Sequence, residues 1–169
     1  MEESIFAKLF SVNVNDKIEK KGNLSYLSWS YAWGEIKKAF PDATYTVYER
    51  ETATGPVFYF TDGRTCWVKT GLTINGLEHI EMLPVMDFSN RALPLERVTS
   101  TDVNKAIQRS LTKAAARHGL GLYIYAGEDL PEEEAEALKR DEAKKPKAPL
   151  PEIKKDAASD VIQTDKLPW

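Results

Sequence analysis

The segment TSTDVNKAIQRSLTKAAARHGLG, residues 99–121, carries a basic residue at every fourth position over most of its length. An α-helix turns by about 100° per residue, so residues four apart lie only about 40° apart around its axis. In a helix the four cations therefore form one continuous line, and we call them the basic stripe: Lys105, Arg109, Lys113 and Arg117. After Asp102 the segment contains no acidic residue that could neutralise this line.

Both ends of this helix are marked in the sequence. Ser100 or Thr101 can act as the N-cap, Asp102 favours the positive end of the helix dipole, and Gly119 suits a left-handed C-cap. A second face predicts contact with a core and comprises Val103, Ile107, Leu111, Ala114, Ala115 and His118. Ala106 and Ala116 fall within the arc of the stripe, where small side chains would let a bulky ligand approach the helix backbone.

The basic stripe has two interpretations. Amphipathic helices normally carry lysine and arginine on their wet side, where these residues only solvate the surface. Solvated faces, however, usually mix both signs and gain from oppositely charged i,i+4 pairs, whereas four like charges repel one another. A nucleic-acid backbone laid along the stripe would remove this repulsion and release counterions. The pattern therefore favours a polyanion, with a solvated face as the alternative.

The residues before the stripe predict one further helix and several strands. Ser28 is the expected N-cap of a helix over residues 29–40, whose apolar face comprises Trp29, Trp33, Ile36 and Phe40. Runs rich in aromatic and β-branched residues predict strands at 44–50, 57–61, 65–74 and 77–88. Asp62-Gly63 and Asn75-Gly76 mark tight turns between them. The predicted fold class is α+β, an antiparallel meander packed with a long basic helix, and GLYIYAG, residues 121–127, predicts a short strand or buried turn.

The chain divides by composition into two parts. Up to Leu130 it holds 15 basic and 16 acidic residues, and after it 8 basic and 10 acidic ones, so neither part is basic overall. Any nucleic-acid binding must then depend on the local arrangement of charge. Residues 1–130 predict one globular domain, whereas residues 131–169 are rich in charge and proline and predict a disordered tail.

The aromatic run NLSYLSWSYAW, residues 23–33, also has two interpretations. Nucleobases stack on exposed aromatic rings, so Tyr26 or Tyr31 can serve a single-stranded nucleic acid. Trp29 and Trp33 share the apolar face of the predicted helix and are expected in the core. Tyr31 lies on the opposite side of that helix and is the candidate for base stacking.

Other chemistry finds little support in the sequence. Cys66 is read as a strand residue, and with only His79 and His118 beside it there is no zinc-site spacing, so we expect no metal. No phosphate-binding P-loop is present, and the acidic residues around Glu49 and Glu51 lack the lysine of a metal-dependent nuclease. We expect no enzyme and no cofactor. Without a signal peptide or membrane segment, a cytoplasmic protein is expected.

Taken together, LSYLSWSYAW, the strands and VTSTDVNKAIQRSLTKAAARHGLGLYIY resemble the phage Sak-type single-strand annealing proteins, distant relatives of the eukaryotic Rad-fifty-two annealing protein. The resemblance covers residues 4–130. It implies a β-β-β-α core, assembly into rings or filaments, and a groove for single-stranded DNA between a hairpin and the long helix. It also implies that the basic stripe binds DNA, that Arg64 and Lys69 lie on the facing hairpin, and that the protein acts in recombination and repair in an infected bacterial host.

The last residues, DKLPW, resemble the C-terminal tip of bacterial single-stranded DNA-binding proteins, in which acidic residues precede a terminal Pro-Phe. Here Trp169 replaces the phenylalanine and Lys166 interrupts the acidic run. The resemblance implies that Leu167, Pro168 and Trp169 bind a phage exonuclease or a host replication or repair protein. A chance terminus is the alternative.

Two functions of other classes remain as rivals to ATP-independent strand annealing. One is a passive single-stranded DNA-binding protein with an OB barrel and a partner-recruiting tip, although such a barrel binds DNA on its strands and not on a long helix. The other is an adaptor whose helix binds acidic proteins.

Overall fold

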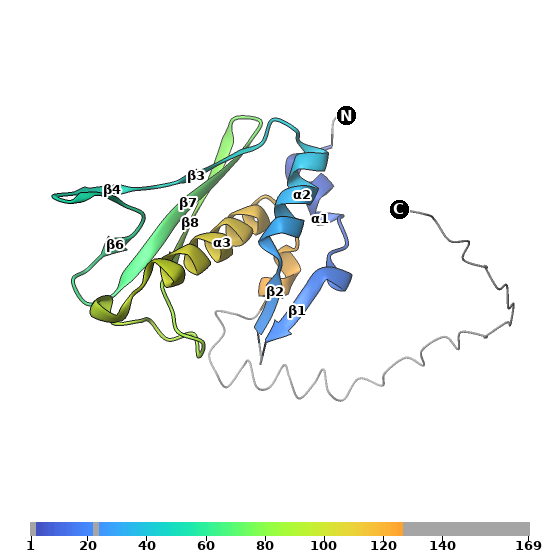
Figure 1. The fold of residues 1–169 in the computed structure, drawn as a ribbon. Coiled ribbons are helices and arrows are strands. Elements are labelled where there is room, and N and C mark those ends of the chain that lie inside the picture. The colour runs from blue at the N-terminus through green and yellow to red at the C-terminus, as the bar shows by residue number, and fades with distance from the viewer. Residues whose placement is uncertain (1–2, 22–23, 127–169) are drawn as a thin grey trace, which may run out of the picture. The chain divides into compact units, whose positions relative to one another are not determined.

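The structure is a computed structural model that describes residues 3–21 and 24–126 (Figure 1). These residues form an α+β fold, as the sequence predicts. The helices are α1 Ile5–Phe10, α2 Trp29–Ala39 and α3 Ser100–Arg117, and the strands are β1 Ile18–Lys21, β2 Leu24–Leu27, β3 Thr44–Val47, β4 Arg50–Thr52, β5 Gly55–Val57, β6 Phe60–Thr61, β7 Cys66–Ile74 and β8 Leu77–Pro84. Three 3-10 turns complete them: η1 Asn15–Lys17, η2 Leu95–Arg97 and η3 Leu122–Tyr125. None of the described helices has the length and apolar character needed to span a membrane.

Strand β7 is the centre of a four-stranded antiparallel sheet. It pairs with β8 along its whole length, while β3 and β6 share its other edge. The hairpin predicted at Asn75-Gly76 is confirmed, with both residues at positive φ, 50° and 81°. The predicted strands 44–50 and 57–61 are wrong in extent, because β4 and β5 pair with each other in a separate hairpin that extends away from α3 (Figure 1).

Helix α3 packs on one face of this sheet. Side chains alternate along β7, and its buried residues Cys66, Val68 and Thr70 point toward the helix. The hydroxyl groups of Thr70 and Ser110 are hydrogen-bonded at 2.7 Å in the buried interface. The helix meets the sheet with small residues, which allows its backbone to come close to β7: Ala106, Ser110 and Ala114.

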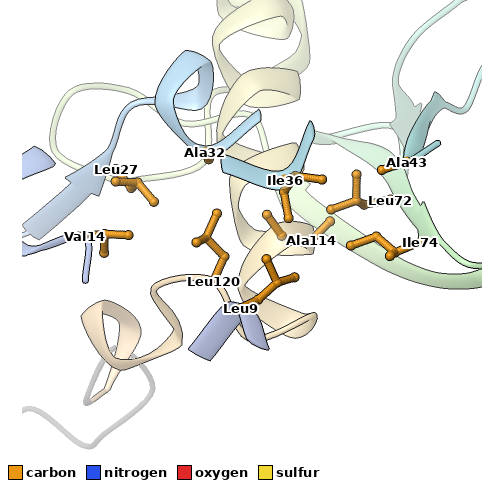
Figure 2. Packing of buried hydrophobic residues seen from close by; sticks show 11 residues of the cluster. Leu9, Val14, Leu27, Ala32, Ile36, Ala43, Leu72, Ile74, Ala114 and Leu120 are labelled. Carbon is orange, nitrogen blue, oxygen red and sulfur yellow. The ribbon is translucent and has the colours of Figure 1, made fainter. Parts of the chain in front are cut away.

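Two apolar cores lie along α3. The larger one joins α1, β2, α2, β7 and the C-terminal half of α3, and its side chains point toward one another in Figure 2: Leu9, Val14, Leu27, Ala32, Ile36, Ala43, Leu72, Ile74, Ala114 and Leu120. The smaller one joins β7, β8 and the N-terminal half of α3: Cys66, Val68, Leu83, Val85 and Ala106. Both sides of α3 are thus covered over much of its length.

Several details of the sequence prediction are corrected at the helices. The N-cap of α3 is Thr99 rather than Ser100 or Thr101, because Thr99 forms a reciprocal capping box with Asp102. Ala106 and Ala116 are buried by the protein itself, so no ligand can approach the helix backbone there.

Helix α2 and the segment after α3 also differ from expectation. Ser28 is the N-cap of α2, but its hydroxyl is bonded to that of Ser30 and does not cap the backbone. Trp29 is 51% exposed and is not the core residue that its face predicts, because it precedes the turns of α2 that the core covers. Of the two alternatives for the segment after α3, the turn is confirmed and the strand is not, but no residue of the 3-10 turn η3 is buried.

A buried histidine links the end of α3 to the sheet. His118 Nε2 lies 2.8 Å from the carbonyl oxygen of Leu72, and its Nδ1 has no hydrogen-bond partner among the described residues. The ring of His79 packs against it, with centroids 4.3 Å apart. Burial lowers the pKa of His118 below its usual 6.5, and His79 acts in the same direction, while the bond to Leu72 opposes them.

This lowered pKa predicts a loss of stability in mild acid. Below pH 6.5 His118 becomes protonated in the unfolded chain but stays largely neutral in the folded protein, so the unfolded state binds more protons. The free energy of unfolding should therefore decrease as the pH is lowered from 6.5, until the pH lies below the pKa of His118 in the folded protein. Urea unfolding between pH 7 and pH 5 should show this fall, and His118→Gln should flatten it. An equal pH slope in His118→Gln and in the unsubstituted protein would contradict the assignment.

The glycine after α3 predicts a second stability effect. Gly119 has φ 116°, and a Cβ there would lie 2.6 Å from the carbonyl oxygen of Phe6 in α1. Gly119→Ala should therefore lower the free energy of unfolding by more than about 1 kcal/mol. Gly34→Ala is the matched control, since Gly34 lies within α2 with nothing within 4 Å and should gain roughly 0.5–1 kcal/mol. Equal effects of the two substitutions in chemical denaturation would rule out the α1 contact as the cause.

Candidate nucleic-acid interface

Two cations of the basic stripe share a small pocket with aromatic rings. Arg109 and Lys113 project from the middle of α3 toward Tyr26 on β2 and Tyr125 on η3. These four residues line a hollow of about 180 Å³, to which Trp29, Gln108 and Thr112 also contribute. We call it the cation pocket. Among residues 3–21 and 24–126, none that lines it is acidic.

Each of the two cations lies over a ring. The guanidinium carbon of Arg109 is 5.1 Å from the ring centre of Tyr26, and Nζ of Lys113 is 5.3 Å from that of Tyr125. An aromatic ring attracts a cation that lies over its face and fixes its position, although the ring itself carries no net charge. The pocket therefore orients positive charge toward an open hollow.

The loop between β8 and α3 supports this arrangement from the side. Asn90 Oδ1 accepts long hydrogen bonds from Arg109 Nη2 at 3.4 Å and from the hydroxyl of Tyr26 at 3.5 Å. The Asp87 carboxylate fixes the loop by accepting from the backbone amides of Ser89 and Arg91. These backbone hydrogen bonds, chiefly that from Arg91, hold the pKa of Asp87 below its usual value.

The two ends of the stripe have different surroundings. Arg117 forms an ion pair with Glu81 of β8, and this partner raises the pKa of Arg117. The expectation that all four cations lack an acidic partner is therefore wrong at Arg117, because the acid comes from the sheet and not from the helix. Lys105 is exposed at the other end. There the hydrogen bonds from Thr99 and, to a lesser degree, the positive charge of Lys105 lower the pKa of Asp102.

The other predicted site residues are not brought to the cation pocket. Lys69 lies on the face of β7 opposite to Thr70 and α3, with its Nζ 4.6 Å from the ring centre of Tyr48. Arg64 is exposed in the turn between β6 and β7. Tyr31 packs against the larger core, and Lys17 lies over its ring. The structure does not test whether these three residues contact DNA.

The sequence interpretation missed part of the pocket. Tyr26 was one of two candidates in the aromatic run, and it is Tyr26 rather than Tyr31 that contacts the stripe. Tyr125 and Asn90 were not expected, although the aromatic residues directly after Gly121 were a visible signal for the former. The partner-binding residues predicted in the tail, Leu167, Pro168 and Trp169, lie outside the described residues, as does the whole predicted tail from residue 131.

The cation pocket can bind an anion and stack a planar group. Arginine and lysine neutralise phosphate, while tyrosine rings provide faces for unpaired bases. Both kinds of contact occur together in proteins that hold single-stranded nucleic acid along a charged groove.

Comparison with known proteins agrees with this chemistry. Neither the curated proteins nor the solved structures yield a significant match to the chain. The model of one protein family, described as Sak Single Strand Annealing Protein, matches residues 4–160 and thus nearly the whole chain. The chain therefore belongs to the family of Sak single strand annealing proteins.

Proposed function

We propose that this protein binds single-stranded DNA along the basic stripe and anneals complementary strands without ATP, in homologous recombination. Family membership supports the annealing of single strands. The observation that carries the proposal for the site is the cation pocket, in which Arg109 and Lys113 lie side by side over the rings of Tyr26 and Tyr125.

The mechanism follows from charge. Phosphates of one strand occupy positions next to Arg109 and Lys113, while most of its bases remain accessible to a second strand. The protein screens the repulsion between the two backbones, and base pairing itself supplies the free energy, so no cofactor takes part. Lys105 extends the binding surface, whereas Arg117 contributes less because Glu81 already neutralises it.

Further parts of the proposal concern assembly and partners. The protein acts as a homo-oligomeric ring or filament in the cytoplasm of an infected bacterial host. Leu167, Pro168 and Trp169 recruit a phage exonuclease or a host replication or repair protein. The family resemblance supports the proposed assembly and host, and the sequence of the tail supports the proposed partners.

The alternative function is passive protection of single strands with recruitment through the tail. An OB-fold protein of this class would bind DNA on a five-stranded barrel. Among residues 3–21 and 24–126, the largest sheet instead has four strands and packs α3 on one face. Strand annealing is therefore the preferred function.

The proposal predicts faster annealing in the purified system. Complementary oligonucleotides mixed with the protein should pair faster than alone, without ATP, and single strands should bind more tightly than duplex. Fluorescence energy transfer between end-labelled strands measures the rate. Protection of single strands with annealing at the rate of free DNA would instead support the passive alternative.

Two substitutions in the cation pocket test the site. Arg109→Ala and Lys113→Ala should together weaken binding of single-stranded DNA by roughly tenfold or more. Each should also reduce the slope of log affinity against log salt by about 0.7. Thermal stability should change little, because neither side chain belongs to the two apolar cores.

Lys38→Ala is the matched control for these substitutions, since Lys38 is exposed on α2, pairs with Glu35 and does not line the cation pocket. It should leave both affinity and salt slope unchanged. If the double substitution and the control behave alike, the basic stripe is only a solvated face.

A further inference from the structure

A second and larger hollow opens beside the cation pocket. It lies between α2, α3 and strand β3 and has a volume of about 420 Å³, within the range of sites that hold small organic ligands. We call it the aromatic groove. Its walls include Trp29, Trp33, Tyr45 and Phe58, together with the apolar face of α3 at Ile107 and Leu111.

The groove leaves uncovered a surface that the sequence predicts to be core. Two aromatic residues that line the groove are half exposed, Trp29 at 51% and Tyr45 at 53%. Ile107 and Leu111 are only partly buried. The rings are nevertheless held in defined positions, since Trp33 meets Tyr45 edge to face at 5.4 Å. An ordered, exposed aromatic surface of this kind is typical of a binding site.

The aromatic groove is continuous with the cation pocket. Trp29, Gln108 and Thr112 line both hollows. A ligand lying on Trp29 is therefore next to the cations of Arg109 and Lys113. The ligand that fits both hollows has a neutral, planar part for the groove and an anionic part for the pocket.

We infer that the aromatic groove binds unpaired nucleobases of the same DNA strand whose phosphates lie at Arg109 and Lys113, with Trp29 as the stacking platform. This inference rests on the proposed function and adds a base-binding site to it. The bases next to the cation pocket occupy the groove, and the remaining bases of the strand stay accessible for pairing.

The chemistry of the lining favours bases over a protein segment. Within the described part of the chain no charged residue lines the groove, so these walls offer no ion pair to the charged groups of a peptide segment. Its polar groups include the side-chain amides of Asn104 and Gln108, which can both donate and accept hydrogen bonds. Such amides match the edges of unpaired bases, and aromatic faces stack on them without regard to sequence.

The test compares two ligands that carry the same charge. One is an oligothymidylate, and the other is an oligonucleotide of equal length in which every base is missing. Trp29→Ala should weaken binding of the oligothymidylate by roughly 5-fold to 150-fold, the range for one stacked base, and leave the abasic strand unaffected. Arg109→Ala should weaken both ligands alike. Phe88→Ala is the control, because Phe88 is 93% exposed and lies outside the groove, and it should change neither affinity.

A second readout does not depend on the alanine variant being folded. The oligothymidylate should quench the tryptophan fluorescence of the unsubstituted protein, whereas the abasic strand should not. The Trp29→Phe variant should lose this quenching while its affinity for the oligothymidylate stays within a few-fold of the original value. The inference is overturned if Trp29→Ala weakens both ligands equally or neither of them. It is also overturned if Trp29→Ala changes only the sedimentation of the protein, which would make the groove a protein interface. Failure of the unsubstituted protein to bind either strand overturns the proposed function as well.

Discussion

The close approach of α3 to the central strand β7 is the constraint on which the other described elements depend. It is possible because the helix meets the sheet with Ala106, Ser110 and Ala114, and it is fixed by the buried hydrogen bond between Ser110 and Thr70. With the sheet on one side and α2 on the other, most of the helix surface is covered. Its long basic side chains can then project only along the remaining open edge.

This placement gives the four cations of the stripe different surroundings. The sheet lies close to the C-terminal end of the helix, so Glu81 pairs with Arg117 there. In the middle, Arg109 lies over the ring of Tyr26 and Lys113 over that of Tyr125, and these rings orient the two cations without carrying a charge of their own. The same constraint leaves Ile107 and Leu111 facing the aromatic groove, because α2 and the sheet do not close over them.

The sequence predicts local features well wherever a short pattern determines the backbone. The Asn75-Gly76 hairpin, the extent of α3, the positive φ of Gly119 and the α+β class were all accessible from spacing and turn chemistry. Periodicity could not show which neighbours cover each face of α3. It therefore placed Ala116 at the surface and Trp29 in the core, and it missed Glu81, which lies far away in the chain. Helix α1 and the β1–β2 hairpin carried no strong pattern and were not predicted.

We propose that single-stranded DNA lies on the open edge of α3 and not on the outer face of the sheet. Acetylation of lysines, quantified by mass spectrometry with and without an oligothymidylate, tests this placement directly. We expect DNA to protect Lys105 and Lys113 from acetylation, while Lys38 and Lys69 should react as they do in the free protein. Protection of Lys69 together with unchanged reaction of Lys105 and Lys113 would contradict it.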